Sequence, residues 1–151
     1  MKLEDAIKSN KFKSETQKAG LNVLYTAWWL KTISTKEMKT FDLTHEQYNV
    51  LRILKGKHPV KMCIKDIASR MIEKSSNVPR IVDRLEIKLL IERTQGEVDG
   101  RQTVITLTEK GIEVLSKATE KLNTTWEDAI SMKDEDASAL STLLEKMRTL
   151  E

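Results

Sequence analysis

The chain has 151 residues and a net charge of +3; 39% of its residues are hydrophobic and 32% are charged, which suits one domain with a real core. No run approaches the roughly 18 apolar residues of a membrane-spanning helix, and residues 1–15 lack the apolar core of a signal peptide, so we expect a cytoplasmic protein without a membrane segment. The single cysteine, Cys63, excludes an intramolecular disulfide framework and leaves too few thiols for a structural zinc site.

From about residue 14 to residue 39 the pattern is helical and unusually apolar. The apolar side chains do not form one stripe but cover much of the circumference: Leu21, Val23, Leu24, Tyr25, Trp28, Trp29, Leu30 and Ile33. A helix that is apolar on most sides has to be buried on most sides. In a chain this small we expect a partner subunit to supply part of that cover.

A second helix is predicted to begin after Thr44, because Thr44 and Gln47 have the spacing of a capping box. This helix should end near Gly56, and the following His58-Pro59 marks a loop. Cys63 could cap a short third helix, which residues 72–74 then connect tightly to the next one. The buried positions of this short helix should be Ile64, Ile67, Ala68 and Met71.

Residues 75–89 predict a fourth helix with one apolar stripe, formed by Val78, Ile81, Val82, Leu85 and Leu89. Ser75 and Ser76 are N-cap candidates, and Pro79 is tolerated because it falls in the first turn. The opposite face carries Ser76, Asn77, Arg80 and Arg84. Such a face suits the major groove of DNA, although any surface helix is charged on one side. Together with the short helix before it, this segment predicts a helix-turn-helix.

After Leu90 the period changes to that of two strands, residues 91–94 and 103–107, which are β-branched and partly alternating. Gly96 and Asp99-Gly100 between them are strong turn signals. The segment therefore predicts a β-hairpin directly behind a helix-turn-helix, which is a wing. Arg101 lies just past the turn, where its guanidinium could enter a minor groove or remain solvated.

Two further helices are predicted at the C-terminal end. The first starts near Thr108 and repeats Leu115, Ala118, Leu122, Trp126 and Ile130; the second opens with three acids at residues 134–136 and carries Leu140, Leu143, Leu144 and Met147. No repeat, low-complexity segment or linker divides the chain. The fold class is therefore mainly α with a small β-hairpin wing, and the terminal helices are left to pair with a second copy.

Charge is distributed unevenly along the chain. Residues 52–84 contain nine basic residues and three acidic ones, a net charge of +6, which leaves −3 for the remainder. A basic middle segment is typical of a nucleic-acid-binding module, although a solvated lysine-rich face would look similar.

The order of these elements resembles the MarR family of bacterial transcription regulators. The sharpest match is residues 99–111, DGRQTVITLTEKG, which resemble the family's wing signature: an Asp, an Arg two residues later, then Leu-Thr-x-x-Gly. Residues 82–86 and 90–93 resemble the end of the recognition helix and the first wing strand, and residues 43–51 resemble the second helix of the family. The resemblance covers essentially the whole chain, as one MarR-like domain of residues 1–151.

This resemblance implies a winged helix-turn-helix lobe at about 43–108, with dimerisation helices at about 1–40 and 109–151. It implies a homodimeric, sequence-specific DNA-binding regulator, a repressor, on an inverted-repeat operator in double-stranded DNA. Ser75, Ser76, Asn77 and Arg80 would face base edges or phosphates, and Arg101 would reach the minor groove. Arg84 would hold phosphate or brace the wing. Lys65 and Lys74 are candidate phosphate contacts, which set position rather than sequence.

Two positions depart from the family pattern. Leu89 stands where the family usually has a glycine that closes the recognition helix; left-handed dihedrals there would cost about 1 kcal/mol. Pro79 occupies a place often held by Thr or Ser, so a hydroxyl that could touch DNA is missing. Both bear on the target sequence rather than on DNA binding itself.

Family members often release DNA when a small aromatic compound enters a cleft between the dimer helices and the DNA lobe. The residues that could line such a cleft here are Tyr25, Trp28, Trp29 and Trp126, although large aromatic side chains also fill cores. Other relatives sense oxidants through a cysteine. Cys63 lies between Lys61 and Lys65 near a predicted helix start, which favours a reactive thiol; a buried, inert thiol is the alternative.

We expect no enzyme, metal or cofactor, because His45 and His58 are separate and no nucleophile motif or glycine-rich phosphate loop is present. The competing class is a winged helix that serves as a protein-interaction module without specific DNA binding. Arg80, Arg101 and the basic segment favour the DNA-binding interpretation, since a protein-docking surface has no need of them.

Overall fold

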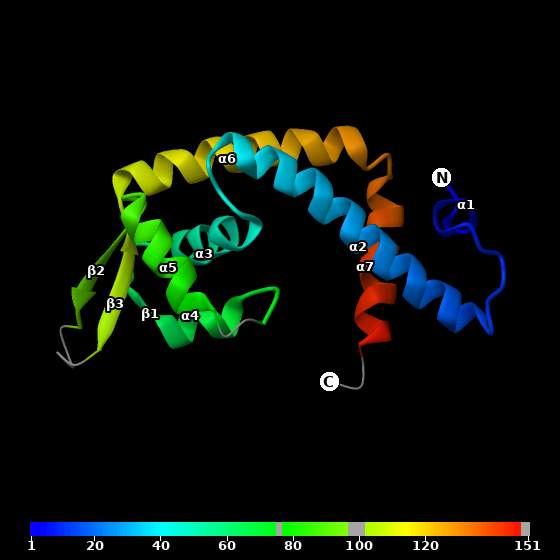
Figure 1. The fold of residues 1–151 in the computed structure, drawn as a ribbon, viewed down its shortest axis with the longest axis horizontal. Helices are drawn as coiled ribbons and strands as arrows, with labels where there is room; N and C mark the ends of the chain where they lie inside the picture. Colours follow the sequence, from blue (N-terminus) through cyan, green and yellow to red (C-terminus); the bar gives the residue numbers. More distant parts are fainter. Residues whose placement is uncertain (75–76, 97–101, 149–151) are drawn as a thin grey trace.

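In a computed structural model of the chain, which describes residues 1–74, 77–96 and 102–148, two long helices lie side by side above a smaller lobe (Figure 1). The long helices are α2 (Glu15–Thr40) and α6 (Glu109–Ala129). The lobe contains α3 (His45–Lys55), β1 (Met62–Cys63), α4 (Ile64–Arg70), α5 (Val78–Ile87), β2 (Ile91–Gln95) and β3 (Thr103–Leu107). The ends of the chain carry α1 (Leu3–Ile7) and α7 (Asp134–Met147). The predicted architecture, mainly helical with a β-hairpin wing, is confirmed.

The wing strands form a three-stranded antiparallel sheet with β1, in the order β1-β3-β2. Ile91 pairs with Leu107 and Arg93 with Ile105, so β2 is an edge strand held by β3 alone. The strand β1, in which Met62 pairs with Ile105, was not predicted. Two residues carry no periodicity of their own, and only the distant β3 makes them a strand.

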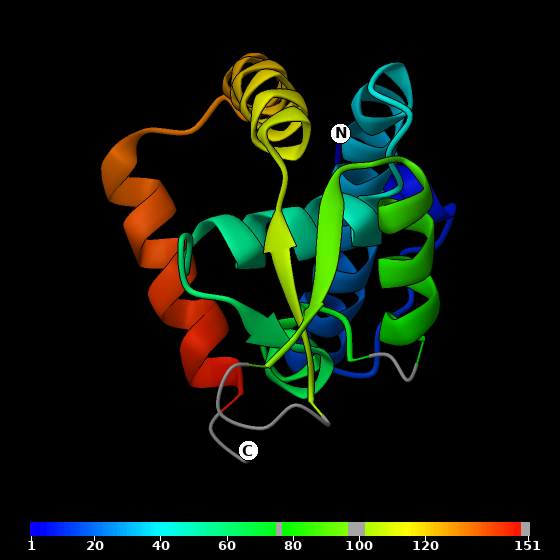
Figure 2. The ribbon, with the colours of Figure 1, turned by 90° about the vertical axis from the view of Figure 1, so that its left-hand side faces the viewer.

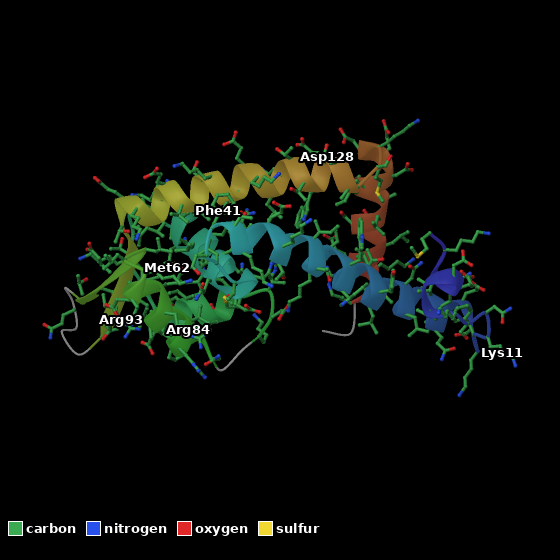
Figure 3. The ribbon with its side chains drawn as sticks, turned by 45° about the horizontal axis from the view of Figure 1, so that its top comes forward. Lys11, Phe41, Met62, Arg84, Arg93 and Asp128 are labelled. Carbon is green, nitrogen blue, oxygen red and sulfur yellow. The ribbon has the colours of Figure 1, made fainter. Side chains whose placement is uncertain are left out.

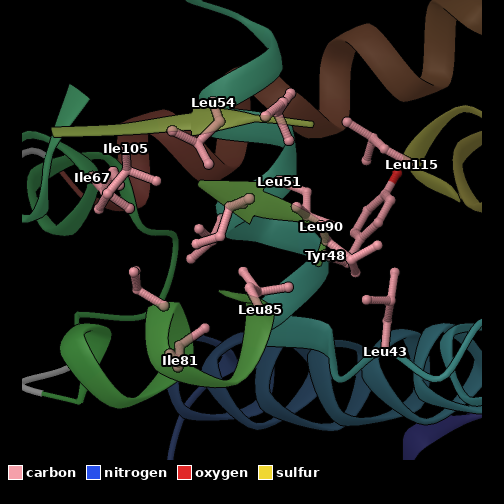
Figure 4. Close-up of a cluster of buried hydrophobic side chains, with 14 of the residues drawn as sticks. Leu43, Tyr48, Leu51, Leu54, Ile67, Ile81, Leu85, Leu90, Ile105 and Leu115 are labelled. Atoms are coloured by element: carbon pink, nitrogen blue, oxygen red, sulfur yellow. The ribbon is translucent and has the colours of Figure 1, made fainter. Parts of the chain in front are cut away.

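The hydrophobic core lies inside the lobe and beneath the two long helices (Figure 4). It includes the buried faces of α3 and α5 and the sheet residues Ile91 and Ile105. Capping fixes where its helices start: the Thr44 hydroxyl accepts from the Gln47 amide, and the Gln47 side chain accepts from the Thr44 amide. This reciprocal capping box confirms the start of α3 predicted at Thr44.

The fourth predicted helix, α5, is shorter than predicted at both ends. It begins at Val78 with Asn77 as the N-cap residue, so the predicted serine cap is wrong, and Ser75 and Ser76 lie outside the described residues. Pro79 does fall in the first turn. Leu89, the predicted last member of the apolar stripe, is 66% exposed, because the helix ends at Ile87 and the chain turns there. Leu90 and Ile91 fill the core instead.

A close junction joins the end of α5 to the start of α6. The Thr108 amide donates to the Leu90 carbonyl at 3.2 Å, and the Thr108 hydroxyl donates to the Leu89 carbonyl at 2.8 Å and accepts from the Gly111 amide. Gly111 packs so tightly against Leu90 that a Cβ there would overlap the Leu90 carbonyl oxygen. The Leu-Thr-x-x-Gly pattern is therefore the joint between the wing, the recognition helix and α6.

Large apolar side chains remain exposed on the outer helices. Leu24 and Trp28 of α2 are 68% and 59% exposed, and Leu143 of α7 is 64% exposed. No described residue of α7 is buried, and Figures 1 and 2 show this helix to one side of the lobe. The predicted stripe of α7 is therefore formed but finds no cover within one chain. None of the described helices is long and apolar enough to cross a membrane.

Candidate nucleic-acid interface

The N-terminal end of α5 and the far ends of β2 and β3 point the same way, away from α6 (Figure 1). The junction at Thr108 fixes the other end of both elements, since it bonds α6 to residues 89 and 90. A helix and a hairpin that leave a common joint in one direction can enter neighbouring grooves of a duplex.

The exposed face of α5 is basic. Arg80 and Arg84 are exposed and lie on its outer side, whereas Val78, Ile81, Val82 and Leu85 are buried beneath. A groove of about 330 Å³ separates this side of α5 from the start of α3 and the turn before α5. It brings together four of the predicted DNA-binding residues, namely Lys74, Asn77, Arg80 and Arg84.

Two of the three acidic residues in the basic segment are paired with cations from outside it. Lys31 of α2 donates to Glu73 at 2.7 Å, and Arg93 of β2 forms an ion pair with Asp83. The third acid, Asp66, accepts a hydrogen bond from the thiol of Cys63. These pairings reduce the negative potential beside Arg80 and Arg84, which strengthens the attraction of this face for phosphate.

Lys31 links α2 to the helix-turn-helix. Its ammonium group hydrogen-bonds Glu73 and also lies 3.9 Å from Glu46 at the start of α3. The hydrogen bond with Glu73 raises the pKa of Lys31 above its ordinary value, so the ammonium stays charged across the physiological range. The side chains of Lys31 and Glu73 are about half exposed, and their ion pair therefore contributes little to stability.

The remaining predicted contacts lie around this face. Lys65 is exposed on α4, and Lys74 donates to the Ser69 carbonyl at 2.8 Å, which holds its ammonium group near the end of α4. Ser75, Ser76 and Arg101 lie outside the described residues. The turn before α5 is fixed by Asn49 of α3, whose side-chain oxygen accepts from the Ile72 amide.

The brace between wing and recognition helix is made by Arg93, a residue to which the sequence analysis gave no role. The guanidinium of Arg93 pairs with Asp83 and, at 3.3 Å, with Glu86, both on α5. Figure 3 shows Arg93 in the wing, at the end of the molecule that also holds Arg84. Sequence analysis had offered Arg84 for this brace; Arg84 instead lines the groove on the other side of α5. The sequence pattern that could have predicted this brace is a pair of acids three residues apart on the helix, followed by an arginine in the next strand.

The four aromatic residues proposed for a ligand cleft do not meet in one place. The rings of Tyr25 and Trp28 are tilted by 45° to each other with centroids 5.5 Å apart, and Trp28 lines a shallow groove of about 430 Å³ along α2. Trp29, also on α2, is half-buried. Trp126 lies on the side of α6 that faces α2, where its indole donates to the Ser34 hydroxyl at 3.2 Å. The groove is otherwise polar and basic; its other lining residues are Lys31, Thr32, Thr35, Lys36 and Lys39.

Cys63 is half-buried at the N-cap of α4, as predicted, but its side chain does not cap the helix. The thiol donates to the Asp66 carboxylate at 3.2 Å, a contact that needs the thiol proton. Within the described part of the chain, no three His, Cys, Asp or Glu side chains lie close enough together to hold a metal ion.

A helix-turn-helix whose second helix is exposed and basic, followed at once by an antiparallel hairpin, defines the winged helix-turn-helix class. Comparison with known proteins gives the family. Residues 43–103 match the model of the MarR family. The transcriptional regulator MgrA of Staphylococcus aureus is 32% identical over 117 residues, which cover 76% of each chain. This protein belongs to the MarR family of transcription regulators, a family of regulators rather than enzymes.

Solved structures share the fold at lower identity. The complex of Staphylococcus aureus MepR with DNA superposes with a TM-score of 0.78 at 22% identity, covering 93% of this chain and all of that one. CouR of Rhodococcus jostii, bound to p-coumaroyl-CoA, gives a TM-score of 0.77 at 18% identity, covering 90% and 95%. These similarities confirm the winged-helix fold that the sequence predicted.

Proposed function

We propose that this protein is a dimeric repressor that binds an inverted-repeat operator in double-stranded DNA. The observation that carries the proposal is the groove at the N-terminal half of α5, where Lys74, Asn77, Arg80 and Arg84 converge. Arginine and asparagine are the side chains that read guanine and adenine edges in the major groove. Arg80 is assigned to base or phosphate contacts and Arg84 to phosphate.

The other proposed contacts extend this surface. Ser75 and Ser76 precede α5 and are assigned to base edges or phosphates, and Arg101 in the wing is assigned to the minor groove. Lys65 on α4 is assigned to phosphate. The exposed apolar side chains of α2 and α7 support the dimer, because large apolar groups left in water by one chain favour burial against a second copy. Two copies related by a two-fold axis would match an inverted repeat.

Fluorescence anisotropy tests the proposal on a duplex from upstream of this protein's own gene, with a scrambled duplex beside it. We expect tight binding to the native duplex and a loss of affinity on the order of 10³-fold between about 50 mM and about 200 mM salt. Arg80→Ala and Arg101→Ala should each cost about 1–3 kcal/mol. Lys117→Ala is the matched control, because Lys117 is an exposed cation on α6, outside the proposed surface.

Equal and weak binding to both duplexes would call for selection from random DNA. If that selection also enriched no sequence, the protein would be a winged-helix interaction module instead.

A small aromatic anion is the proposed effector. The groove along α2 places Trp28 beside three lysines, and CouR, a relative in fold, binds p-coumaroyl-CoA. Quenching of tryptophan fluorescence by an aromatic carboxylate, lost in Trp28→Leu, would support this site. A redox-sensing role for Cys63 is the alternative; oxidation would then have to release the operator in the native protein but not in Cys63→Ser.

A further inference from the structure

Outside the apolar core, the edge strand β2 contacts the recognition helix through the ion pairs of Arg93. Ile91 and Arg93 lie two residues apart in β2, so their side chains leave the same face of the strand. Ile91 is buried in the core beneath α5, whereas Arg93 is further out toward the wing turn. The face of β2 that packs on α5 therefore changes from apolar to ionic at Arg93.

Arg93 reaches two carboxylates on one side of α5. Asp83 and Glu86 are three residues apart and therefore lie on the same side of the helix, and the guanidinium pairs with both. Arg93 is 27% exposed, less than either partner. Its Nη2 donates a hydrogen bond to Asp83, whereas the contact between Nε and Glu86 is an ion pair without a hydrogen bond. Since β2 has a ladder partner on one side only, this contact is a second restraint that holds the strand against the helix, in addition to the burial of Ile91.

We propose that Arg93 is a positioning residue for DNA binding: it holds the wing at a fixed angle to the recognition helix and neutralises acidic charge on the side of α5 that faces the wing. This inference rests on the proposed function of the lobe as a DNA-binding surface. Arg93 acts through Asp83 and Glu86, and not by a contact of its own with phosphate. A wing held in this way loses little conformational entropy when it meets the minor groove.

A charge exchange between Arg93 and Asp83 tests the proposal. Operator affinity is measured by anisotropy for the native protein, Arg93→Asp, Asp83→Arg and the combined variant, with a thermal midpoint for each. Arg93→Asp should weaken binding at least about tenfold. The combined variant should bind at least about tenfold more tightly than the product of the two single effects predicts, because the ion pair is restored in the opposite sense. The operator affinity of Arg93→Lys should lie between those of the native protein and Arg93→Asp.

Hydrogen exchange of the amides of residues 91–95 in free protein supplies a readout that does not depend on DNA. The exchange rate of these amides should rise in Arg93→Asp and return to the native rate in the combined variant. Lys117→Glu, which breaks the exposed Lys117–Glu113 pair of α6, is the matched control and should leave both operator affinity and this exchange unchanged.

The outcomes separate the two proposals. If the native protein binds operator but the two single effects simply multiply, Arg93 acts independently of Asp83 and the positioning role is overturned, whereas the proposed function stands. If the native protein selects no duplex at all, the proposed function fails and this inference fails with it.

Discussion

Leu89 closes the recognition helix in the left-handed region, with a φ of 60°. The Leu90 amide donates to the Leu85 carbonyl and the Leu89 amide to the Glu86 carbonyl, which is the hydrogen-bond pattern of a Schellman motif. The motif aims the chain into β2 and buries Leu90. A leucine fulfils this role at the expense of steric strain between its Cβ and the backbone, a strain that glycine avoids.

Leu89→Gly should stabilise the protein. The substitution relieves about 1–2 kcal/mol of strain, and the greater freedom of glycine in the unfolded chain offsets about 0.5–1 kcal/mol of that gain. We expect a net increase of up to about 1 kcal/mol in the free energy of unfolding, measured by urea denaturation. Leu89→Ala is the control: it keeps the Cβ and should show no gain. Equal effects of the two substitutions would mean that left-handed strain is not what the glycine relieves.

Gly111→Ala should prevent the junction between α5 and α6 from closing. The new Cβ would overlap the Leu90 carbonyl oxygen, a backbone atom that cannot rotate away. We expect a loss of at least about 2–3 kcal/mol in the free energy of unfolding. Gly20→Ala on α2 is the matched control, because no atom lies within 4 Å of its Cβ position. That substitution should gain up to about 1 kcal/mol from helix propensity; a similar loss in both variants would contradict the steric explanation.

At the scale of the elements, the lobe is tied to the long helices at both ends of α5. At its C-terminal end, Lys88 bonds the Asp42 carbonyl and the Gln47 side chain, and its own carbonyl accepts from Lys110 of α6. At its N-terminal end, Lys31 of α2 donates a hydrogen bond to Glu73 in the preceding turn. A shift of α2 would therefore reach both ends of the recognition helix.

The Lys31 tie should be lost at alkaline pH and not at neutral pH. The hydrogen bond with Glu73 raises the pKa of Lys31, so this contribution is complete below the unfolded pKa of about 10.5 and disappears as the pH rises through the folded pKa. Lys31→Gln should lower the free energy of unfolding by at most about 1 kcal/mol at pH 7, because the pair is partly exposed.

The native protein and Lys31→Gln should differ less in their free energy of unfolding above about pH 10.5 than at neutral pH. Urea denaturation at neutral and alkaline pH measures it. Lys36→Gln, the same substitution on the same helix and in the same groove, is the control. A Lys31 difference that stayed constant through the alkaline range would show that the ion pair contributes nothing.

At the scale of the whole molecule, some of the large apolar side chains are buried in the core and others remain exposed. The lobe has a closed core, whereas α2 and α7 turn large apolar side chains outward, and no described residue of α7 is buried. Burial of a leucine side chain contributes about 1.5–3 kcal/mol, so several exposed leucines can supply a stable interface.

Leu24→Glu should shift the protein from dimer to monomer, because a carboxylate in an apolar interface loses its hydration without a partner. Analytical ultracentrifugation measures the shift. Val60→Glu is the matched control: Val60 is 64% exposed, similar to Leu24, but lies in the lobe and should leave the dimer intact. A native protein that sediments as a monomer at every concentration would contradict the dimer proposal directly.

Local sequence patterns predicted most of the fold. The capping box at Thr44, the change of period after Leu90 and the turn signals before Thr103 are each set by a few adjacent residues, and the elements they define are confirmed. They also placed Arg80 and Arg84 on the exposed side of the recognition helix, because a helix with a strong apolar stripe has one orientation on a core.

Contacts between segments distant in sequence required the tertiary structure. The sheet partner of Met62 lies 43 positions later, Lys31 meets Glu73 across 42 positions, and Arg93 reaches back ten positions to Asp83. None of these residues has a local pattern that names its partner, because a charge or a single apolar side chain can be satisfied in many places on a surface.

The sequence by itself therefore determined the order and kind of the elements and the basic character of one face. The tertiary structure alone decided how the wing is held to the recognition helix and which apolar faces remain uncovered. The reason is physical: helix and turn preferences depend on neighbours along the chain, whereas ion pairs and burial depend on what the fold brings near in space.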